Sequence, residues 1–294
     1  MPIAAETLPR VPSAVPGWER ARRVVRRHPL AVFGGLVLGV LVAVVLLPGV
    51  FATHDPFALR AEDKHLPPSR AHWFGTDELG RDIYSRVVYG TRLSLLSALG
   101  VVALSSVSGT LLGVVAGYQA GVFDMVAMRL ADIFISFPAL IMAMAIVSFF
   151  GPTLVNAMLA IACIWWPQYA RLVRGQVLSV REHPYIEAAV STGASRARIL
   201  LRHILPNSFV PVFIKATLDF GYAILLTASL SFLGLGAQPP SPELGALVTA
   251  GRVYLLTSWW YATFPGLVIF LAVLGLNLVG DGVRDLLDPA LRGE

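Results

Sequence analysis

The chain has 294 residues, of which 56% are hydrophobic and only 14% are charged, and its net charge at pH 7 is +5. Soluble globular proteins average about 25% charged residues, so this composition excludes an ordinary water-soluble enzyme. Uncharged apolar stretches of about 18 residues or more recur along the sequence, and each is long enough to cross a bilayer. The chain is therefore expected to be an all-α polytopic membrane protein.

The N-terminal segment, residues 1–29, is polar and ends in a cluster of arginines. A stretch without charge follows, and residues 30–50 are predicted to form the first transmembrane helix. Basic residues before an apolar run also mark secretory signals, and Val50-Phe51-Ala52 is a weak cleavage pattern. The apolar run exceeds the usual signal length of about 7–15 residues, so we expect a retained span with a cytoplasmic N-terminus.

Residues 51–92 form a long polar stretch that is expected to be extracytoplasmic and to contain a surface helix. Thr76 is a suitable N-cap for this helix, and Asp77 lies in its first turn. Two carboxylate and arginine pairs have i,i+4 spacing, and three apolar residues recur at the same spacing to form a stripe. These are Asp77 with Arg81 and Asp82 with Arg86, and Leu79, Ile83 and Val87.

The same stretch contains three histidines and three carboxylates that could bind a transition metal: His54, His65, His72, Asp55, Glu62 and Asp63. Their spacing matches no compact ligand pattern, so a solvated loop is the favoured interpretation. No metal site is expected.

Five further spans are predicted in residues 93–283, at about 93–117, 126–150, 154–173, 209–235 and 258–280. Residues 284–294 form a C-terminal tail. Six spans place both termini on one side of the membrane. Fifteen basic residues fall on that side and seven on the other, so the termini are expected to be cytoplasmic.

Gly109, Gly113, Gly117 and Gly121 place a small residue at every fourth position of the second span. Such a strip lets a neighbouring helix approach closely. It could serve a subunit interface, but ordinary helix packing within the bundle is the favoured interpretation.

Lys215 and Asp219 are spaced i,i+4 within the fifth span. Charges within a span are costly and usually face a partner or a wet cavity, so a position on a translocation path is possible. A pair that neutralises itself near the cytoplasmic end is slightly favoured over that role.

Motifs of several enzyme classes are absent from the sequence. It contains no G-x-x-x-x-G-K-[ST] phosphate loop, no H-E-x-x-H pair and no G-x-S-x-G elbow. The single cysteine, Cys163, cannot form an intrachain disulfide. The chain is therefore expected to be non-catalytic, and any ATP that drives it must be bound by another subunit.

The long loop at 176–206, between the fourth and fifth spans, is expected to be cytoplasmic and to form two short helices joined by a sharp turn. Pro184 suits the first turn of one helix, and Gly193 can end that helix in a left-handed conformation. Ser195 is a suitable cap for the second helix, which Pro206 is expected to end. The loop could equally be a simple surface elbow.

The residues of this loop resemble the EAA loop of ABC importer permeases. The pattern is Glu187-Ala188-Ala189, three residues, Gly193, nine residues, and then His203, Ile204, Leu205 and Pro206. In that family the loop forms the coupling helix that docks into a cytoplasmic ATPase. The resemblance therefore implies an ATPase-coupling role for Glu187, Ala188, Ala189, Gly193, His203, Leu205 and Pro206.

Three further stretches are similar to the C-type permease subunit of dipeptide, oligopeptide and nickel ABC importers: residues 75–82, 230–236 and 277–282. The resemblance implies a type I ABC importer permease fold with six transmembrane helices in the bacterial cytoplasmic (inner) membrane. It also implies a homologous B-type permease, two cytoplasmic ABC ATPase domains that bind ATP and Mg, and an extracytoplasmic substrate-binding protein. Membrane lipid surrounds the chain, which is expected to bind no cofactor and no nucleic acid.

The expected function is that of a permease forming half of a translocation pathway that works by alternating access. A peptide substrate is favoured over a nickel chelate or haem, from the resemblance alone. The alternative is an ion-coupled secondary carrier or channel without ATPase partners, for which Lys215 and Asp219 are the best support. The sequence shows no inverted repeat, which weakens this alternative.

Overall fold

The structure, a computed structural model, describes residues 29–287 and leaves the expected N-terminal basic segment and most of the C-terminal tail outside the described residues. The described part is almost entirely helical, and its one β-bridge joins Thr76 to Asp82. Its long helices are α2 (Pro29–Leu46), α4 (Ile83–Gln119), α7 (Leu154–Arg181), α10 (Leu205–Phe232) and α12 (Trp260–Leu287). Shorter elements are α3 (Pro48–Phe51), η1 (Ala61–Asp63), α5 (Gly121–Ser136), α6 (Ala139–Phe150), α8 (Pro184–Ser191), α9 (Arg196–Ile199), η2 (Leu200–Ile204), α11 (Leu244–Gly251) and η3 (Arg252–Tyr254).

Four helical stretches within residues 29–287 are long and apolar enough to cross a membrane: Pro29–Leu46, Ile83–Gln119, Arg196–Phe232 and Trp260–Arg284. A fifth is reached if α5 and α6 together count as one bent span. Helix α7, the expected fourth span, is not among them, and its second half carries Arg171, Arg174 and Arg181. The chain is thus an all-helical, multi-pass membrane protein with four or five candidate spans, and the expected number of six is not reached.

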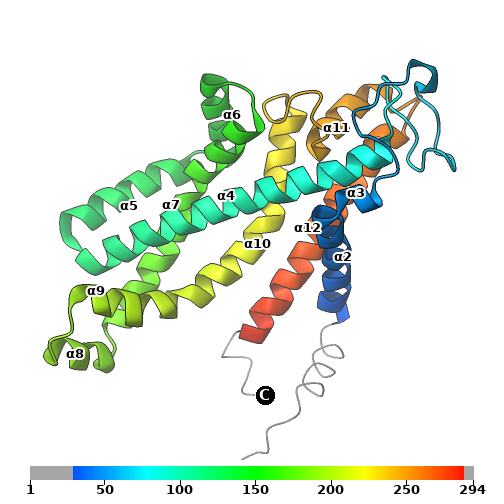
Figure 1. The fold of residues 1–294 in the computed structure, drawn as a ribbon. Coiled ribbons are helices and arrows are strands. Elements are labelled where there is room, and N and C mark those ends of the chain that lie inside the picture. The colour runs from blue at the N-terminus through cyan, green and yellow to red at the C-terminus, as the bar shows by residue number, and fades with distance from the viewer. Residues whose placement is uncertain (1–28, 288–294) are drawn as a thin grey trace, which may run out of the picture.

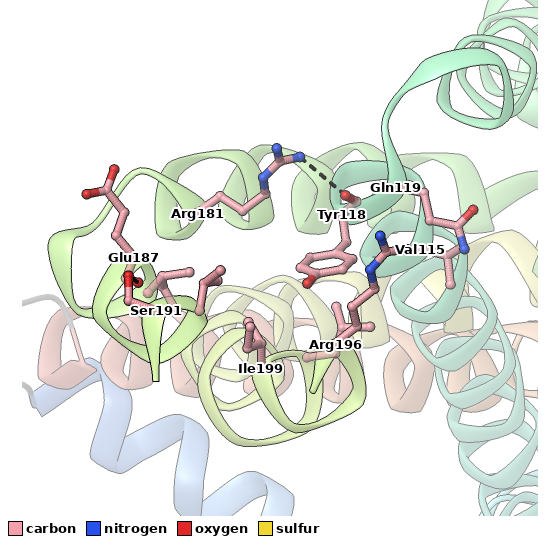
Figure 2. A pocket seen from close by; sticks show the side chains of 11 residues that line it. Val115, Tyr118, Gln119, Arg181, Glu187, Ser191, Arg196 and Ile199 are labelled. Carbon is pink, nitrogen blue, oxygen red and sulfur yellow. Dashed lines mark hydrogen bonds between the residues drawn. The ribbon is translucent and has the colours of Figure 1, made fainter. Parts of the chain in front are cut away.

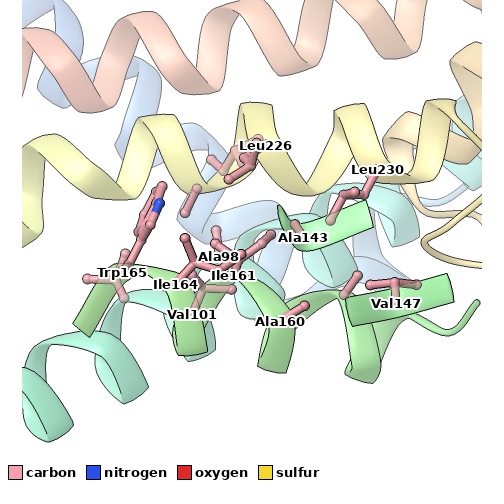
Figure 3. Close-up of a cluster of buried hydrophobic side chains, with 14 of the residues drawn as sticks. Ala98, Val101, Ala143, Val147, Ala160, Ile161, Ile164, Trp165, Leu226 and Leu230 are labelled. Carbon is pink, nitrogen blue, oxygen red and sulfur yellow. The ribbon is translucent and has the colours of Figure 1, made fainter. Parts of the chain in front are cut away.

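The core lies where α4, α6, α7, α10 and α12 meet. Buried side chains such as Val101, Ile161 and Leu230 interdigitate there with alanines of the facing helices (Figure 3). Helix α2 packs along α12 at one edge of the bundle (Figure 1). Most of the surface of α2 remains apolar and exposed, as expected for a helix that contacts lipid.

The glycine strip is an interface between α4 and α7. A Cβ atom added at Gly109 would lie 2.4 Å from the Trp166 carbonyl oxygen, and one added at Gly113 would lie 2.4 Å from that of Ala170. The strip therefore serves packing within the chain, as favoured from the sequence. Gly117 also contacts α7, but the inclusion of Gly121 was wrong. Helix α4 ends at Gln119, and Gly121 begins α5 with a φ of +72° and no atom within 4 Å of the added Cβ.

The expected surface helix, capped at Thr76 and carrying the stripe of Leu79, Ile83 and Val87, forms only from Ile83 on, as the start of α4, and residues 76–82 are not helical. Asp77 is buried, and its Oδ1 accepts hydrogen bonds from the backbone N–H groups of Leu79 and Arg81, each at 2.9 Å. This side-chain bonding competes with helical hydrogen bonds. Gly75 and Gly80 have φ angles of +72° and +74°, which a right-handed helix does not allow. The segment is a compact turn, and α4 begins at Ile83 with Asp82 as its N-cap.

The expected span 126–150 is broken rather than continuous. Helix α5 ends at Ser136, α6 begins at Ala139, and the two are bent by 96° relative to each other. Proline disfavours the helical conformation for the residue that precedes it, and Phe137, before Pro138, has an extended backbone. The proline between two apolar stretches was the signal that the sequence interpretation overlooked.

Candidate functional site

The candidate site is the loop between α7 and α10, which lies at the opposite end of the bundle from residues 51–82 (Figure 1). It contains α8, a turn, α9 and the π-helical segment η2. Pro184 occupies the first position of α8, where its missing N–H needs no partner. The oxygen of Ser195 accepts a hydrogen bond from the backbone N–H of Arg198 and caps α9, as predicted.

The turn after α8 is a Schellman motif. The backbone N–H of Ala194 donates to the carbonyl oxygen of Ala189 at 3.0 Å, and that of Gly193 donates to Val190 at 2.9 Å. Gly193 has a φ of +80°, which confirms the predicted left-handed conformation. A Cβ atom at Gly193 would meet no atom within 4 Å, so the requirement for glycine comes from the backbone angle alone.

The prediction that Pro206 ends the second helix was wrong. Helix α9 continues through η2 into α10, and Pro206 lies in the first turn of α10. In η2 the backbone N–H of Leu205 donates to the carbonyl oxygen of Leu200, five residues earlier. Such a π-helical turn shifts the hydrogen-bond register just before the proline, and a proline is tolerated where a helical segment starts.

The loop is anchored by a buried apolar root, which we define as Ile186, Ile199 and Ile204. These side chains are at most 4% exposed and pack with Val173 and Val177 of α7. Val114 of α4 joins the same cluster. The root fixes α8 and α9 against the two helices that the glycine strip holds together.

The outer face of the loop is exposed, and its side chains are small or partly apolar. Glu187 and Ala188 are exposed, and Ala189 is half-buried because its carbonyl belongs to the turn. Tyr185, Val190 and Leu201 are apolar or aromatic residues that are also exposed. An exposed apolar face on an anchored helix is typical of a protein-binding surface.

A cavity of about 990 Å³ lies between this loop and the end of α4 (Figure 2). Glu187, Arg181 and Arg196 supply its charged side chains. The Arg181 guanidinium donates to the carbonyl oxygens of Gly117 and Tyr118, where the free carbonyls at the end of α4 favour a positive charge. Glu187 and the C-terminal end of α4 therefore line the same cavity.

The other predicted residues of the loop, His203, Leu205 and Pro206, do not join the exposed face of α8. His203 and Leu205 are half-buried, and Pro206 is exposed at the start of α10. The ring of His203 lies 6.0 Å from that of Tyr185. These residues flank the root.

Lys215 and Asp219, the predicted pair on α10, lie away from the loop and bind each other. The Lys215 Nζ is 3.0 Å from Asp219 Oδ2, and it also donates to Gln168 Oε1 of α7 at 3.0 Å. The same Nζ lies 5.1 Å from the centre of the Tyr169 ring. These contacts fit the favoured interpretation of a locally neutralised pair, and they link α10 to α7.

Glu243 is a structural residue that the sequence interpretation missed. Its side chain is fully buried, accepts a hydrogen bond from Ser94 Oγ at 2.8 Å and caps α11 through the backbone N–H of Ala246. Its position directly before an apolar run gave only a weak signal, because glutamate is not among the residues usually found at N-caps. It fixes α11 against α4.

Comparison with known proteins shows that two protein-family models match this chain. Residues 109–293 match the family described as binding-protein-dependent transport system inner membrane component. Residues 18–68 match the N-terminal TM domain of oligopeptide transport permease C.

Several named proteins are similar along nearly their whole length. The chain is 48% identical to the probable D,D-dipeptide transport system permease protein of Escherichia coli K12, over 92% of this chain and 91% of that protein. It is 41% identical to the dipeptide transport system permease protein of Alkalihalophilus pseudofirmus, over 95% of this chain and 92% of that protein. It is 43% identical to a glutathione transport system permease protein of Pectobacterium atrosepticum, over 92% of this chain and 90% of that protein.

Proposed function

Because the chain belongs to the binding-protein-dependent transport system inner membrane component family, we propose that it is the membrane-spanning permease subunit of an ATP-driven importer for di- and oligopeptides. The family match covers more than half of the chain. The peptide assignment is supported by the names of the relatives, which are dipeptide, D,D-dipeptide and glutathione permeases.

The loop of α8 and α9 is the part of the chain that couples to ATP hydrolysis. The observation that supports this role is the exposed face containing Glu187, Ala188 and Ala189, which lies over the buried root. A partner ATPase would contact the exposed face, and the root would transmit its movement to α7 and α4. ATP acts on the equilibrium between inward-open and outward-open states only through its higher affinity for the closed ATPase pair.

The partners follow from this role. A homologous B-type permease would complete the translocation path, and two ABC ATPase domains would bind ATP and Mg²⁺ on the cytoplasmic side. A substrate-binding protein would deliver peptide to the extracytoplasmic side. The chain itself carries no catalytic residue in this scheme, and its N- and C-termini face the cytoplasm.

The alternative of an ion-coupled carrier without ATPase partners rested on Lys215 and Asp219. Their mutual ion pair and the bond to Gln168 leave neither charge without a partner. No observation favours the alternative, so we retain the importer.

The first experiment is purification of the tagged chain from its native membrane in mild detergent, followed by identification of the proteins that co-elute. Recovery of a second permease and an ATPase with a phosphate loop supports the proposal. A chain that elutes alone and transports in liposomes without ATP overturns it.

The second experiment tests the coupling loop in the reconstituted complex. We expect Gly193→Val to abolish ATP-dependent dipeptide uptake without changing membrane insertion, because a β-branched residue fits poorly at a φ of +80°. Gly151→Val is the matched control, since Gly151 also has a positive φ and open space around it but lies between α6 and α7. Normal uptake by Gly193→Val would show that the turn has no coupling role.

A further inference from the structure

Three potential metal ligands from separate parts of residues 51–82 converge at the start of α4. They are His54, which follows α3, His72, which precedes the compact turn, and Asp82, the N-cap of α4. We call them the His-Asp cluster. His65, the third histidine of this stretch, is not a member, because its Nδ1 lies 3.2 Å from Ser258 Oγ and its ring packs on Tyr254.

The ligand atoms of the cluster are close enough to share one ion. His72 Nδ1 is 2.9 Å from Asp82 Oδ1, and His54 Nδ1 is 3.8 Å from the same oxygen. One ligand atom from each residue lies within 4.8 Å of the others. Ligands bound tetrahedrally at about 2.0–2.1 Å are separated by about 3.4 Å. To bind one ion, His72 Nδ1 and Asp82 Oδ1, which now form a hydrogen bond, would separate by about 0.5 Å, and the His54 side chain would rotate toward them.

The expectation of a solvated loop does not fit these positions. His72 is 6% exposed and Asp82 is 3% exposed, and the rings of His54 and His72 lie with their centroids 4.8 Å apart and their planes tilted by 31°. Two imidazoles brought together around one buried carboxylate are unusual for a loop whose only role is to be solvated. They are the ligand types that bind zinc and related transition metals.

A supporting shell orients the ligands. Ser85 holds two of them: its backbone N–H donates to Asp82 Oδ2 at 2.8 Å, and its Oγ accepts from the backbone N–H of His54 at 2.9 Å. Asp63 Oδ2 lies 4.0 Å from His72 Nε2, the nitrogen that faces away from Asp82. A carboxylate beside the outer nitrogen of a ligating histidine is the usual arrangement in metal sites.

An ion can reach the cluster from one side. The side chain of His54 is 28% exposed and lines a cavity of about 400 Å³ together with Tyr89, Gly49 and neighbours of His54 in residues 52–57. Two imidazole nitrogens and one carboxylate oxygen leave a fourth coordination position of a tetrahedral ion for water.

We propose that the His-Asp cluster binds one divalent transition-metal ion of the zinc class. The ion cross-links the segment after α3, the segment before the compact turn and the start of α4. It stabilises residues 51–82 in the folded arrangement, since a ligand that binds only the folded state favours that state. This inference does not depend on the transported substrate.

The test is metal titration of the purified full-length chain in detergent, carrying an affinity tag without histidines and stripped beforehand with a chelator. Calorimetry with Zn²⁺ is expected to give one ion per chain. Co²⁺ in place of Zn²⁺ is expected to give the intense visible absorption of a four-coordinate ion. The Tm of the chain is expected to rise on addition of Zn²⁺.

The variants separate the cluster from the rest of the loop. His54→Gln is the main variant, because His54 is the most exposed ligand and its loss disturbs the fold least. It is expected to weaken Zn²⁺ binding by at least about 100-fold, and Asp63→Asn by about 10-fold, since changes beside the ligands typically cost about 10–100-fold in affinity. The matched control is His65→Gln, which is expected to bind Zn²⁺ as the unmodified chain does.

Two outcomes would overturn the proposal. One is the absence of stoichiometric Zn²⁺ binding by the folded, unmodified chain. The other is equal Zn²⁺ affinity in the unmodified chain, His54→Gln and His65→Gln, which would assign the binding to scattered surface groups.

Discussion

Two polar regions lie at opposite ends of the bundle and are held in opposite ways. Residues 51–82 contain charged side chains that are buried and bind one another, as Asp77 and Arg81 do. The loop of α8 and α9 is held by the apolar root of Ile186, Ile199 and Ile204, and most of its charged residues are exposed. The first region pairs most of its buried charges internally, with Glu78 Oε2 buried and without a hydrogen-bond partner among residues 29–287, whereas the second leaves its charged groups exposed. Exposed charges can contact a partner protein, whereas buried charges hold the fold of their own region.

The largest expected effect comes from removing the centre of the buried charge network. Asp77 is fully buried, with Oδ2 2.6 Å from Arg81 Nε and 3.7 Å from Arg86 Nε. Asp77→Ala removes the central carboxylate of this network and leaves Arg81 with Glu78 and Arg86 with the Pro56 carbonyl oxygen. Removing one partner of a buried ion pair typically costs about 3–5 kcal/mol. We expect the free energy of unfolding of the purified chain to fall by that amount. Glu62→Ala, at an exposed position of the same stretch, is the control and should change it by less than about 0.5 kcal/mol.

The second prediction tests the apolar root. Ile199 is 1% exposed, and Ile199→Ala should lower the free energy of unfolding by about 2–5 kcal/mol by leaving a cavity. Leu201, two residues later, is 67% exposed, so Leu201→Ala should have little effect on unfolding. Equal effects of the two variants would contradict the distinction between the root and the exposed face.

The third prediction concerns the close contact between α4 and α7 at the glycine strip. Gly113→Ala places a methyl group 2.4 Å from the Ala170 carbonyl oxygen and should cost about 1–3 kcal/mol through overpacking. Gly175→Ala is the matched control on α7, because no atom lies within 4 Å of the added group. Thermal unfolding of both variants measures the difference, and an unchanged Tm for Gly113→Ala would argue against close packing of α4 and α7.

The smallest expected effect on stability is at the exposed face of the loop. Glu187→Gln should change the free energy of unfolding by less than about 0.5 kcal/mol, because Glu187 is exposed. The same variant should reduce ATP-dependent uptake in the reconstituted complex. The two variants therefore separate the two regions. Asp77→Ala is expected to lower the free energy of unfolding, whereas Glu187→Gln is expected to lower ATP-dependent uptake. A loss of stability in Glu187→Gln would place Glu187 with the structural residues.

Local chemistry explains which features the sequence could predict. The turn at Gly193 and the cap at Ser195 depend on residues within a few positions of one another, so the local sequence was sufficient to predict both. The compact turn around Asp77 was misread because its carboxylate bonds the backbone in place of helical hydrogen bonds. The i,i+4 spacing of Asp77 and Arg81 correctly predicted an ion pair between the two side chains. The backbone between them forms a turn, however, and not the helix that the spacing suggested.

Long-range placement explains what the sequence could not predict. His54, His72 and Asp82 are 10 or more positions apart, and nothing in their spacing shows that the compact turn brings them together. The predicted number of six spans is not confirmed, for a different reason. Pro138 divides one apolar stretch into two helices, and the arginines of α7 lower the hydropathy of a helix that packs in the core.

Helix α4 joins the two regions as a single unbroken element. Its 37 residues extend over about 55 Å at ~1.5 Å per residue, which exceeds the roughly 40–45 Å thickness of a bilayer with its headgroups. The helix begins at Asp82 of the His-Asp cluster and ends beside Arg181 and the root. It can therefore act as a lever: a tilt of about 5° about one end displaces the other by about 5 Å, given the length above.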